Sequence, residues 1–248
     1  MREQRKLQKK VAIISTKKMY QELEQLKNYI QILTKSEEVS CLMVCSPAGY
    51  GKTTTTINTL EKAGFKRDIH YIYSTSYITP LEFYHLLAKV NDLSKPKMLV
   101  LDDVEYILGD KKILGLLRSA LWKLPNGKRQ VDYTSSSYKV DKTRIENFTG
   151  RIIILLNKFR EKNPVLEALK DRSIFYQFSP SKEEVWKSLK QLAEQPYSNI
   201  SRRERLKIYD FLKHNAQKQV SFRTLLKAFE IYSINKKGWW DSVGAILK

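Results

Sequence analysis

The sequence predicts an α/β protein with a three-layer core, in which helices cover a parallel five-stranded sheet, followed by a small all-helical lid. Short, almost wholly apolar runs are typical of strands that are buried on both faces. These runs alternate with helix-compatible segments, an order that favours parallel pairing, and only helical patterns follow residue 181. The five expected strands span residues 41–45, 69–73, 98–101, 152–156 and 174–178.

The chain of 248 residues is long enough for one large domain and a small appendage. We expect a basic tail and an N-terminal helix over residues 1–36, the α/β core over 37–180 and the helical lid over 181–248. A hairpin or loop is expected to be inserted at residues 128–149. The N-terminal helix is predicted from the helical spacing of Met19, Leu23, Leu26, Ile30 and Leu33.

Local capping patterns mark where other helices begin. Thr79 and Pro80 have the pattern of an N-cap followed by proline at the first helical position. Ser181 with Glu184 forms a capping-box pattern. Further helices are predicted over residues 54–63, 81–90, 111–124, 201–217, 221–234 and 238–247.

The chain is strongly basic, with a formal net charge of +19 and a pI near 9.7. This excess of Lys and Arg exceeds what solubility needs and indicates a polyanionic partner, most simply nucleic acid. The alternative is a general lysine bias that leaves solvated faces without a partner. No apolar stretch approaches ~20 residues, and no hydrophobic region follows the charged N-terminus, so we expect no membrane association and a cytoplasmic protein, in the host cytoplasm if the chain is viral.

The cysteines and histidines indicate neither a disulfide nor a zinc site. Cys41 and Cys45 would lie about 13 Å apart on one strand, at ~3.3 Å per residue, which is too far for a disulfide. We therefore expect two core thiols in a reducing compartment. The three histidines have no ligand-like spacing.

Residues 46–53 read Ser-Pro-Ala-Gly-Tyr-Gly-Lys-Thr, between an expected strand and an expected helix. In a phosphate-binding P-loop, glycines let backbone N–H groups converge on phosphate oxygens at a helix N-terminus. Lys52 would reach the β- and γ-phosphates of ATP, and the Thr53 hydroxyl would bind Mg²⁺. The pattern has glycine where this chain has Ser46, and the alternative is a ligand-free turn. The predicted nucleotide-binding residues are Ser46, Pro47, Ala48, Gly49, Tyr50, Gly51, Lys52, Thr53 and Thr54.

Asp102 and Asp103 follow four apolar residues, at the expected carboxyl end of a buried strand. Ligands gather at this end of open parallel sheets. Two adjacent acids are costly to leave unpaired there, which favours a metal site over a plain surface turn. Asp102 would hold Mg²⁺ through water, and Asp103 would orient or deprotonate the attacking water.

The order of these motifs resembles that of the AAA+ ATPases, over roughly residues 38–230. Residues 46–53 look like the Walker A motif of that family and residues 99–103 like its Walker B motif. The second Walker B acid is usually Glu, and Asp103 is one carbon shorter, with Glu105 a less well placed substitute. The resemblance implies that Asn157, after the 152–156 run, acts as sensor 1 and helps to align the lytic water.

Two arginines complete the resemblance. Arg172, just before the expected 174–178 strand, resembles an arginine finger, which would stabilise the transferring phosphoryl group of a neighbouring subunit. Its alternative is an arginine favoured by the dipole of a helix C-terminus. Arg223 resembles the sensor 2 residue at the start of a lid helix, where it would reach the γ-phosphate. The resemblance therefore implies a homo-oligomer, a ring or filament, that hydrolyses ATP at subunit interfaces.

A weaker similarity, over residues 101–131, is to AAA+ proteins of phages and other mobile elements, and it suggests DNA replication, transposition or packaging. The leading hypothesis is an ATPase that assembles on DNA and remodels it or a nucleoprotein complex. The alternatives are a protein-remodelling or helicase-loading adaptor and a nucleotide-gated scaffold with very slow hydrolysis. The expected DNA contacts are the basic tail, Lys128, Arg129, Lys139, Lys142, Arg144, Arg202 and Arg203, with Tyr133 and Tyr138 as stacking or packing residues.

Overall fold

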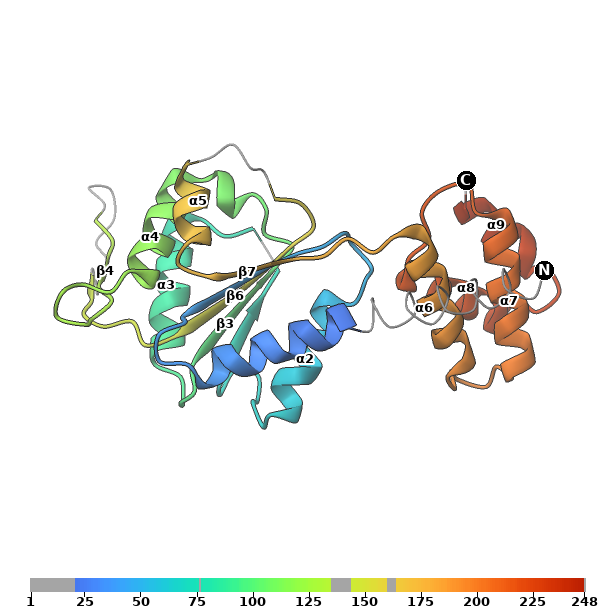
Figure 1. Ribbon diagram of the computed structural model, residues 1–248, viewed down its shortest axis with the longest axis horizontal. Coiled ribbons are helices and arrows are strands. Elements are labelled where there is room, and N and C mark those ends of the chain that lie inside the picture. The colour runs from blue at the N-terminus through green and yellow to red at the C-terminus, as the bar shows by residue number, and fades with distance from the viewer. Residues whose placement is uncertain (1–20, 76, 135–143, 160–163, 248) are drawn as a thin grey trace, which may run out of the picture. The chain divides into compact units, whose positions relative to one another are not determined.

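A computed structural model describes residues 21–75, 77–134, 144–159 and 164–247. It confirms an α/β fold with a five-stranded, all-parallel sheet, in the order β2-β3-β6-β1-β7 (Figure 1). The strands are β1 Cys41–Cys45, β2 Tyr71–Ser74, β3 Met98–Asp102, β6 Arg151–Leu156 and β7 Ile174–Gln177. The three central strands match the apolar runs of the sequence, because a strand covered on both faces has no solvent-facing positions.

The register of the central strands brings their carboxyl ends to one edge of the sheet. Cys45 of β1 lies opposite Leu156 of β6, and Asp102 of β3 lies opposite Leu155. The residues that follow these strands therefore meet at the same edge, which we call the carboxyl edge. The opposite edge, where the strands begin, is the amino edge.

Helices cover both faces of this sheet (Figure 1). The helices α3, α4 and α5 lie on one face, where their apolar residues form one buried cluster with alternate strand residues such as Met43, Leu101 and Ile154. The other strand residues point to the opposite face, where α2 and the helix of residues 21–35 lie. The helices are α2 Lys52–Lys62, α3 Pro80–Asn91, α4 Lys111–Leu121 and α5 Pro164–Lys170, with a 3₁₀ turn η1 at Ile107–Gly109.

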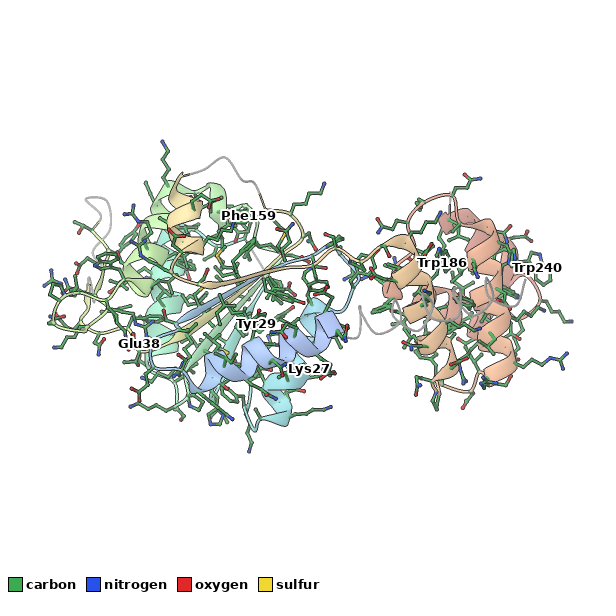
Figure 2. The ribbon with its side chains drawn as sticks, in the orientation of Figure 1. Lys27, Tyr29, Glu38, Phe159, Trp186 and Trp240 are labelled. Atoms are coloured by element: carbon green, nitrogen blue, oxygen red, sulfur yellow. The ribbon has the colours of Figure 1, made fainter. Side chains whose placement is uncertain are left out.

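Caps account for several helix ends. The Thr79 side chain accepts a hydrogen bond from the Glu82 N–H at the start of α3, which confirms that N-cap. The predicted helix over residues 111–124 is three residues too long, because Trp122 has an extended backbone and ends α4 at Leu121. Tyr29 of the 21–35 helix packs its ring on Tyr176 of β7, with centroids 5.1 Å apart (Figure 2).

Within the 128–149 segment, β4 Val131–Asp132 pairs antiparallel with β5 Arg144–Ile145. Tyr133 packs on Tyr84 of α3, with ring centroids 5.6 Å apart, so it has the packing role rather than that of a free stacking surface. Lys139, Lys142 and Tyr138, like the basic tail with Met19, lie outside the described residues.

The chain divides into two compact units, one of residues 26–47 and 52–177, and one of residues 1–25, 48–51 and 178–248. The second unit contains α6 Lys182–Glu194, α7 Arg202–Asn215, α8 Phe222–Ile234 and α9 Trp239–Leu247. Capping boxes begin α6, α7 and α8, and the first of them is the predicted one at Ser181 and Glu184.

Aromatic side chains form much of the interior of this helical unit. Trp239 is buried against Phe211 and Tyr232, and Trp186 packs edge-on against Tyr209 (Figure 2). Trp240 is 43% exposed. Trp239 thus serves the packing of the bundle, which leaves Trp240 as the accessible member of the pair.

Two features of the described residues bear on the environment of the chain. Cys41 and Cys45 are both free thiols, and burial raises the pKa of Cys41 to about 12. Among the helices of the described part of the chain, none has the length and apolar character that a membrane span requires.

Candidate functional site

The loop of residues 46–51 leaves β1 and leads directly into α2. The Ser46 N–H donates to the Leu156 carbonyl at 3.0 Å, which extends the pairing of β1 with β6 by one residue. Gly49 and Gly51 then have φ angles of +84° and +88°, a backbone conformation that side chains disfavour. These two glycines are therefore required by the path of the loop.

Lys52 is buried in the first turn of α2 and turns back towards this loop. Its ammonium donates hydrogen bonds to the carbonyls of Ser46 and Pro47, the latter at 3.1 Å, and to Asn157 Oδ1 at 3.1 Å. Burial lowers the pKa of Lys52, whereas the charges of Asp102 and Asp103 oppose that change. A cation held on neutral carbonyl oxygens is suited to exchange them for the oxygens of an anion.

Thr53 and Asp102 join the start of α2 to the end of β3. The Thr53 hydroxyl donates to Asp102 Oδ2 at 2.7 Å, and Asp102 is only 4% exposed. A hydroxyl and a carboxylate are hard oxygen ligands that fit Mg²⁺, which usually keeps several waters and binds substrate phosphates as well. Within the described residues no cluster of three or more His, Cys, Asp or Glu side chains could hold a metal alone. A metal here would thus need oxygens from a ligand.

Asn157 connects the lysine to the second acid. Its side-chain Nδ2 donates to Asp103 Oδ1 at 2.7 Å, while its Oδ1 accepts the bond from Lys52. Its backbone N–H donates to Glu105 Oε1 at 2.6 Å. Asp103 has a φ of +54°, a left-handed conformation at the end of β3, and its side chain is exposed. Glu105 therefore fixes the position of Asn157, and Asp103 is the carboxylate that faces water.

Tyr73, at the end of β2, belongs to this site and was not predicted from the sequence. Its hydroxyl donates to the same Oδ2 of Asp102, at 2.7 Å. Burial is the main cause that raises the pKa of Tyr73, and its hydrogen bond to Asp102 raises it further, so the hydroxyl remains a donor at neutral pH. Only the adjacency of β2 and β3 in the sheet brings Tyr73 to Asp102, and that adjacency could not be read from the chain.

The structure does not bring Arg172 to these residues. Arg172 precedes β7 at the amino edge, where Ile174 lies opposite Leu42, whereas Ser46 follows β1 at the carboxyl edge. Leu42 and Ser46 are four residues apart along the strand, which separates the start of β7 from the end of β1 by about 13 Å. The Arg172 guanidinium lies over the Trp122 ring, 4.5 Å from its centroid, and donates to the Ala168 carbonyl at 3.2 Å. It lines a hollow of about 560 Å³ together with Arg118, Ser119, Trp122, Gln130 and Asp132.

Arg223 is exposed in the first turn of α8, in the helical unit. That unit includes residues 48–51, and within it the Phe222 N–H donates to the Gly49 carbonyl at 3.2 Å. Gln219 donates to the Tyr50 hydroxyl at 2.6 Å. A Cβ on Gly49 would lie 2.6 Å from the Cβ of Ser221 and 3.9 Å from that of Arg223. Thr54, by contrast, is exposed on α2.

Several of the expected DNA-contacting side chains already have partners. Arg129 donates to the Ala120 carbonyl at 3.2 Å and lies over the Phe148 ring. Arg144 pairs with Asp132 at 2.6 Å, and Arg202 pairs with Glu194 at 3.5 Å. Lys128 and Arg203 are exposed.

Comparison with models of known protein families finds no match, and a search of curated proteins finds no similar sequence. The geometry of the site and the order of its motifs are thus the basis on which a function is inferred.

Proposed function

We propose that this chain is an AAA+-type ATPase that binds ATP with Mg²⁺ and uses its hydrolysis to assemble on DNA and remodel it or a nucleoprotein complex. The observation that carries this proposal is the convergence of Lys52, Thr53, Asp102, Asp103 and Asn157 at the carboxyl edge of three adjacent parallel strands. This is the place in open α/β sheets where ligands bind. The helix N-terminus at Lys52 would supply N–H groups for phosphate oxygens.

Each residue then has a chemical role. Lys52 would exchange its carbonyl acceptors for the β- and γ-phosphate oxygens, and Thr53 and Asp102 would hold Mg²⁺, which neutralises charge on the phosphates. Asp103 would accept a proton from water as the water oxygen attacks the γ-phosphorus and the bond to the β,γ-bridging oxygen breaks. Asn157 donates to Asp103 and accepts from Lys52, so it would fix the position of the base relative to the phosphate-binding lysine.

The proposed partner is DNA, because a net charge of +19 favours a polyanion. The proposed assembly is a homo-oligomer, since Arg172 lies too far from its own Lys52 to reach the same nucleotide. Replication, transposition or packaging is the proposed setting.

The proposal is tested by steady-state ATP hydrolysis against protein concentration, with and without duplex or single-stranded DNA, at low and moderate salt. We expect turnover that rises cooperatively with protein concentration and is stimulated by DNA. Lys52→Ala should abolish nucleotide binding, because it removes the cation of the loop, and unchanged ATP affinity in this variant would refute the site. Retained nucleotide binding with flat or absent turnover would instead support the adaptor or the nucleotide-gated scaffold.

A further inference from the structure

A second cationic site lies at the amino edge of the sheet. A hollow of about 430 Å³, here called the amino-edge hollow, is lined by Thr34, Lys95, Pro96, Lys97, Thr149 and Arg151. Three of these side chains are cations and two carry hydroxyls, and the lining contains no carboxylate. Hydroxyls and cations are the side chains that bind phosphate oxygens, so the composition of the hollow is that of an anion site.

Two of the three cations of the hollow are hydrogen-bonded to neutral groups. The Lys97 ammonium donates to the Asn91 carbonyl, and Arg151 donates to the Ser36 carbonyl from Nε at 3.2 Å and from Nη2 at 2.6 Å. Among the described residues, no ion pair within 4.0 Å includes Lys95, Lys97 or Arg151. The nearby Glu37 carboxylate favours the charged form of Arg151, but burial dominates and lowers the pKa of this guanidinium. The positive charge is therefore only partly compensated by the protein.

A neighbouring hollow of about 320 Å³ shares Arg151 and Thr149 with the first, and its lining contains three cations and the two carboxylates of Glu37 and Glu38. Arg129 lines this second hollow, and burial, assisted by the charge of Arg151, lowers its pKa to about 10. Lys123 also lines it and is paired with Glu38 at 2.7 Å. Two guanidinium groups that repel each other would both gain from an anion between them.

This region is separate from the proposed nucleotide site. Lys97 directly precedes β3 and Arg151 begins β6, whereas Asp102 ends β3 and Asn157 follows β6. Five residues of strand place the two sites about 17 Å apart along the sheet. An ATP molecule on the loop of residues 46–53 thus cannot supply the anion for the amino-edge hollow.

We propose that the amino-edge hollow binds backbone phosphate groups of a nucleic acid, through Lys95, Lys97 and Arg151. Two adjoining hollows with a shared arginine suit a polymer with successive phosphates better than one small anion. This inference rests on the proposed nucleic-acid partner of the chain and is independent of ATP hydrolysis. It adds Lys95, Lys97 and Arg151 to the DNA contacts expected from the sequence, next to Arg129 and Thr149 of the expected 128–149 segment.

The test compares the wild type with Lys95→Gln/Lys97→Gln in binding a labelled DNA duplex and the corresponding single strand, over a range of salt concentrations and without nucleotide. The matched control is Lys111→Gln/Lys112→Gln, which removes two exposed cations from the first turn of α4, on the side of the carboxyl edge. We expect the first variant to bind about tenfold more weakly, with a salt slope lower by about one to two, because one to two phosphate contacts are lost. The control should keep the wild-type slope.

Equal slopes and affinities for the wild type and Lys95→Gln/Lys97→Gln would overturn this inference while leaving the DNA partner intact. If the wild type binds neither the duplex nor the single strand, both the inference and the DNA partner fail. Inorganic phosphate that stabilises the wild type but not the variant, with equal DNA affinities, would assign the hollow to a small anion and also overturn it. If the double variant unfolds at a lower temperature than the wild type, Lys95→Gln alone replaces it in the DNA-binding test, because the Lys95 side chain is exposed.

Discussion

Asp102 receives two hydrogen bonds on one oxygen, from the hydroxyls of Thr53 and Tyr73, each at 2.7 Å. Both bonds fix the orientation of the carboxylate. Tyr73 is thus a positioning residue, which acts on the proposed magnesium site through Asp102. Removal of a residue that hydrogen-bonds to a metal ligand commonly changes metal affinity or activity by about 10–100-fold.

We therefore expect Tyr73→Phe to raise the Mg²⁺ concentration needed for half-maximal ATP binding and hydrolysis by about tenfold. Turnover at saturating Mg²⁺ should remain close to that of the wild type, since the hydroxyl contacts the carboxylate and not the phosphates. A magnesium titration of both activities gives the measurement. Tyr71→Phe, which removes a hydroxyl from the other end of β2, is the control. An unchanged Mg²⁺ midpoint in Tyr73→Phe would exclude the positioning role.

At the scale of the element, the sequence predicted what depends on local pattern and failed where distant segments meet. The strands β3 and β6 could be read directly, because their burial on both faces makes them continuous apolar runs. The caps at Thr79 and Ser181 could be read from short side chains at the correct spacing. The contact of Tyr73 with Asp102 could not be predicted from the sequence, because it depends on which strands are neighbours in the sheet.

The C-terminus of α4 could not be predicted either, because no helix-stopping residue lies where the helix ends. The sequence places Pro125, Asn126 and Gly127 after α4, yet the helix stops at Leu121 because Trp122 leaves the helical conformation. The ring of Trp122 then lies under the Arg172 guanidinium, a contact between segments 50 residues apart in the numbering, so that packing rather than turn chemistry accounts for this position. Glu105 is similar, since its role as acceptor for the Asn157 N–H depends on the pairing of β3 with β6.

The capping box of α7 begins that helix and also links it to α8. Glu204 accepts hydrogen bonds from the Ser201 hydroxyl and N–H, at 2.7 and 2.8 Å, and from the Tyr232 hydroxyl of α8 at 2.7 Å. These bonds favour the charged form, and the Ser201 hydroxyl contributes most, so the pKa of Glu204 falls from 4.5 to about 2. A carboxylate whose pKa is lower in the folded state stabilises the fold above the unfolded pKa, and loses this effect as the pH falls through the folded pKa.

Glu204→Gln should therefore lower the stability of the helical unit at neutral pH, because the neutral amide accepts these bonds more weakly. The stability difference between wild type and variant should shrink as the pH falls below 4.5 and vanish below about pH 2, where the wild-type carboxyl is itself protonated in the folded state. Urea denaturation across this range measures it. Asp210→Asn, at an exposed position on the same helix, controls for the loss of one negative charge. A difference that stays constant down to acid pH would mean that the charge of Glu204 is not the cause.

For the whole molecule, the positions of Arg172 and Lys52 determine how the proposed ATP hydrolysis would be organised. The two side chains belong to opposite edges of one sheet, and Arg172 is held at its edge by Trp122 and the Ala168 carbonyl. If Arg172 acts on a nucleotide bound at Lys52, as proposed, the Arg172 must therefore come from another copy of the chain. Such head-to-tail contacts generate rings or filaments in which each site combines residues of two neighbours.

Mixing experiments test this arrangement. Arg172→Ala should retain ATP binding, since its own loop is intact, and lose hydrolysis by several orders of magnitude, as expected for an arginine finger. Asp103→Ala should also be inactive but still present Arg172. In an equal mixture, we expect about a quarter of wild-type turnover, because half of the sites keep Asp103 and half of those face an intact Arg172 in random head-to-tail assembly. A mixture of Asp103→Ala with Lys52→Ala should stay inactive, since neither subunit has a complete site. Absence of rescue at every ratio of Arg172→Ala to Asp103→Ala would contradict the trans role of Arg172.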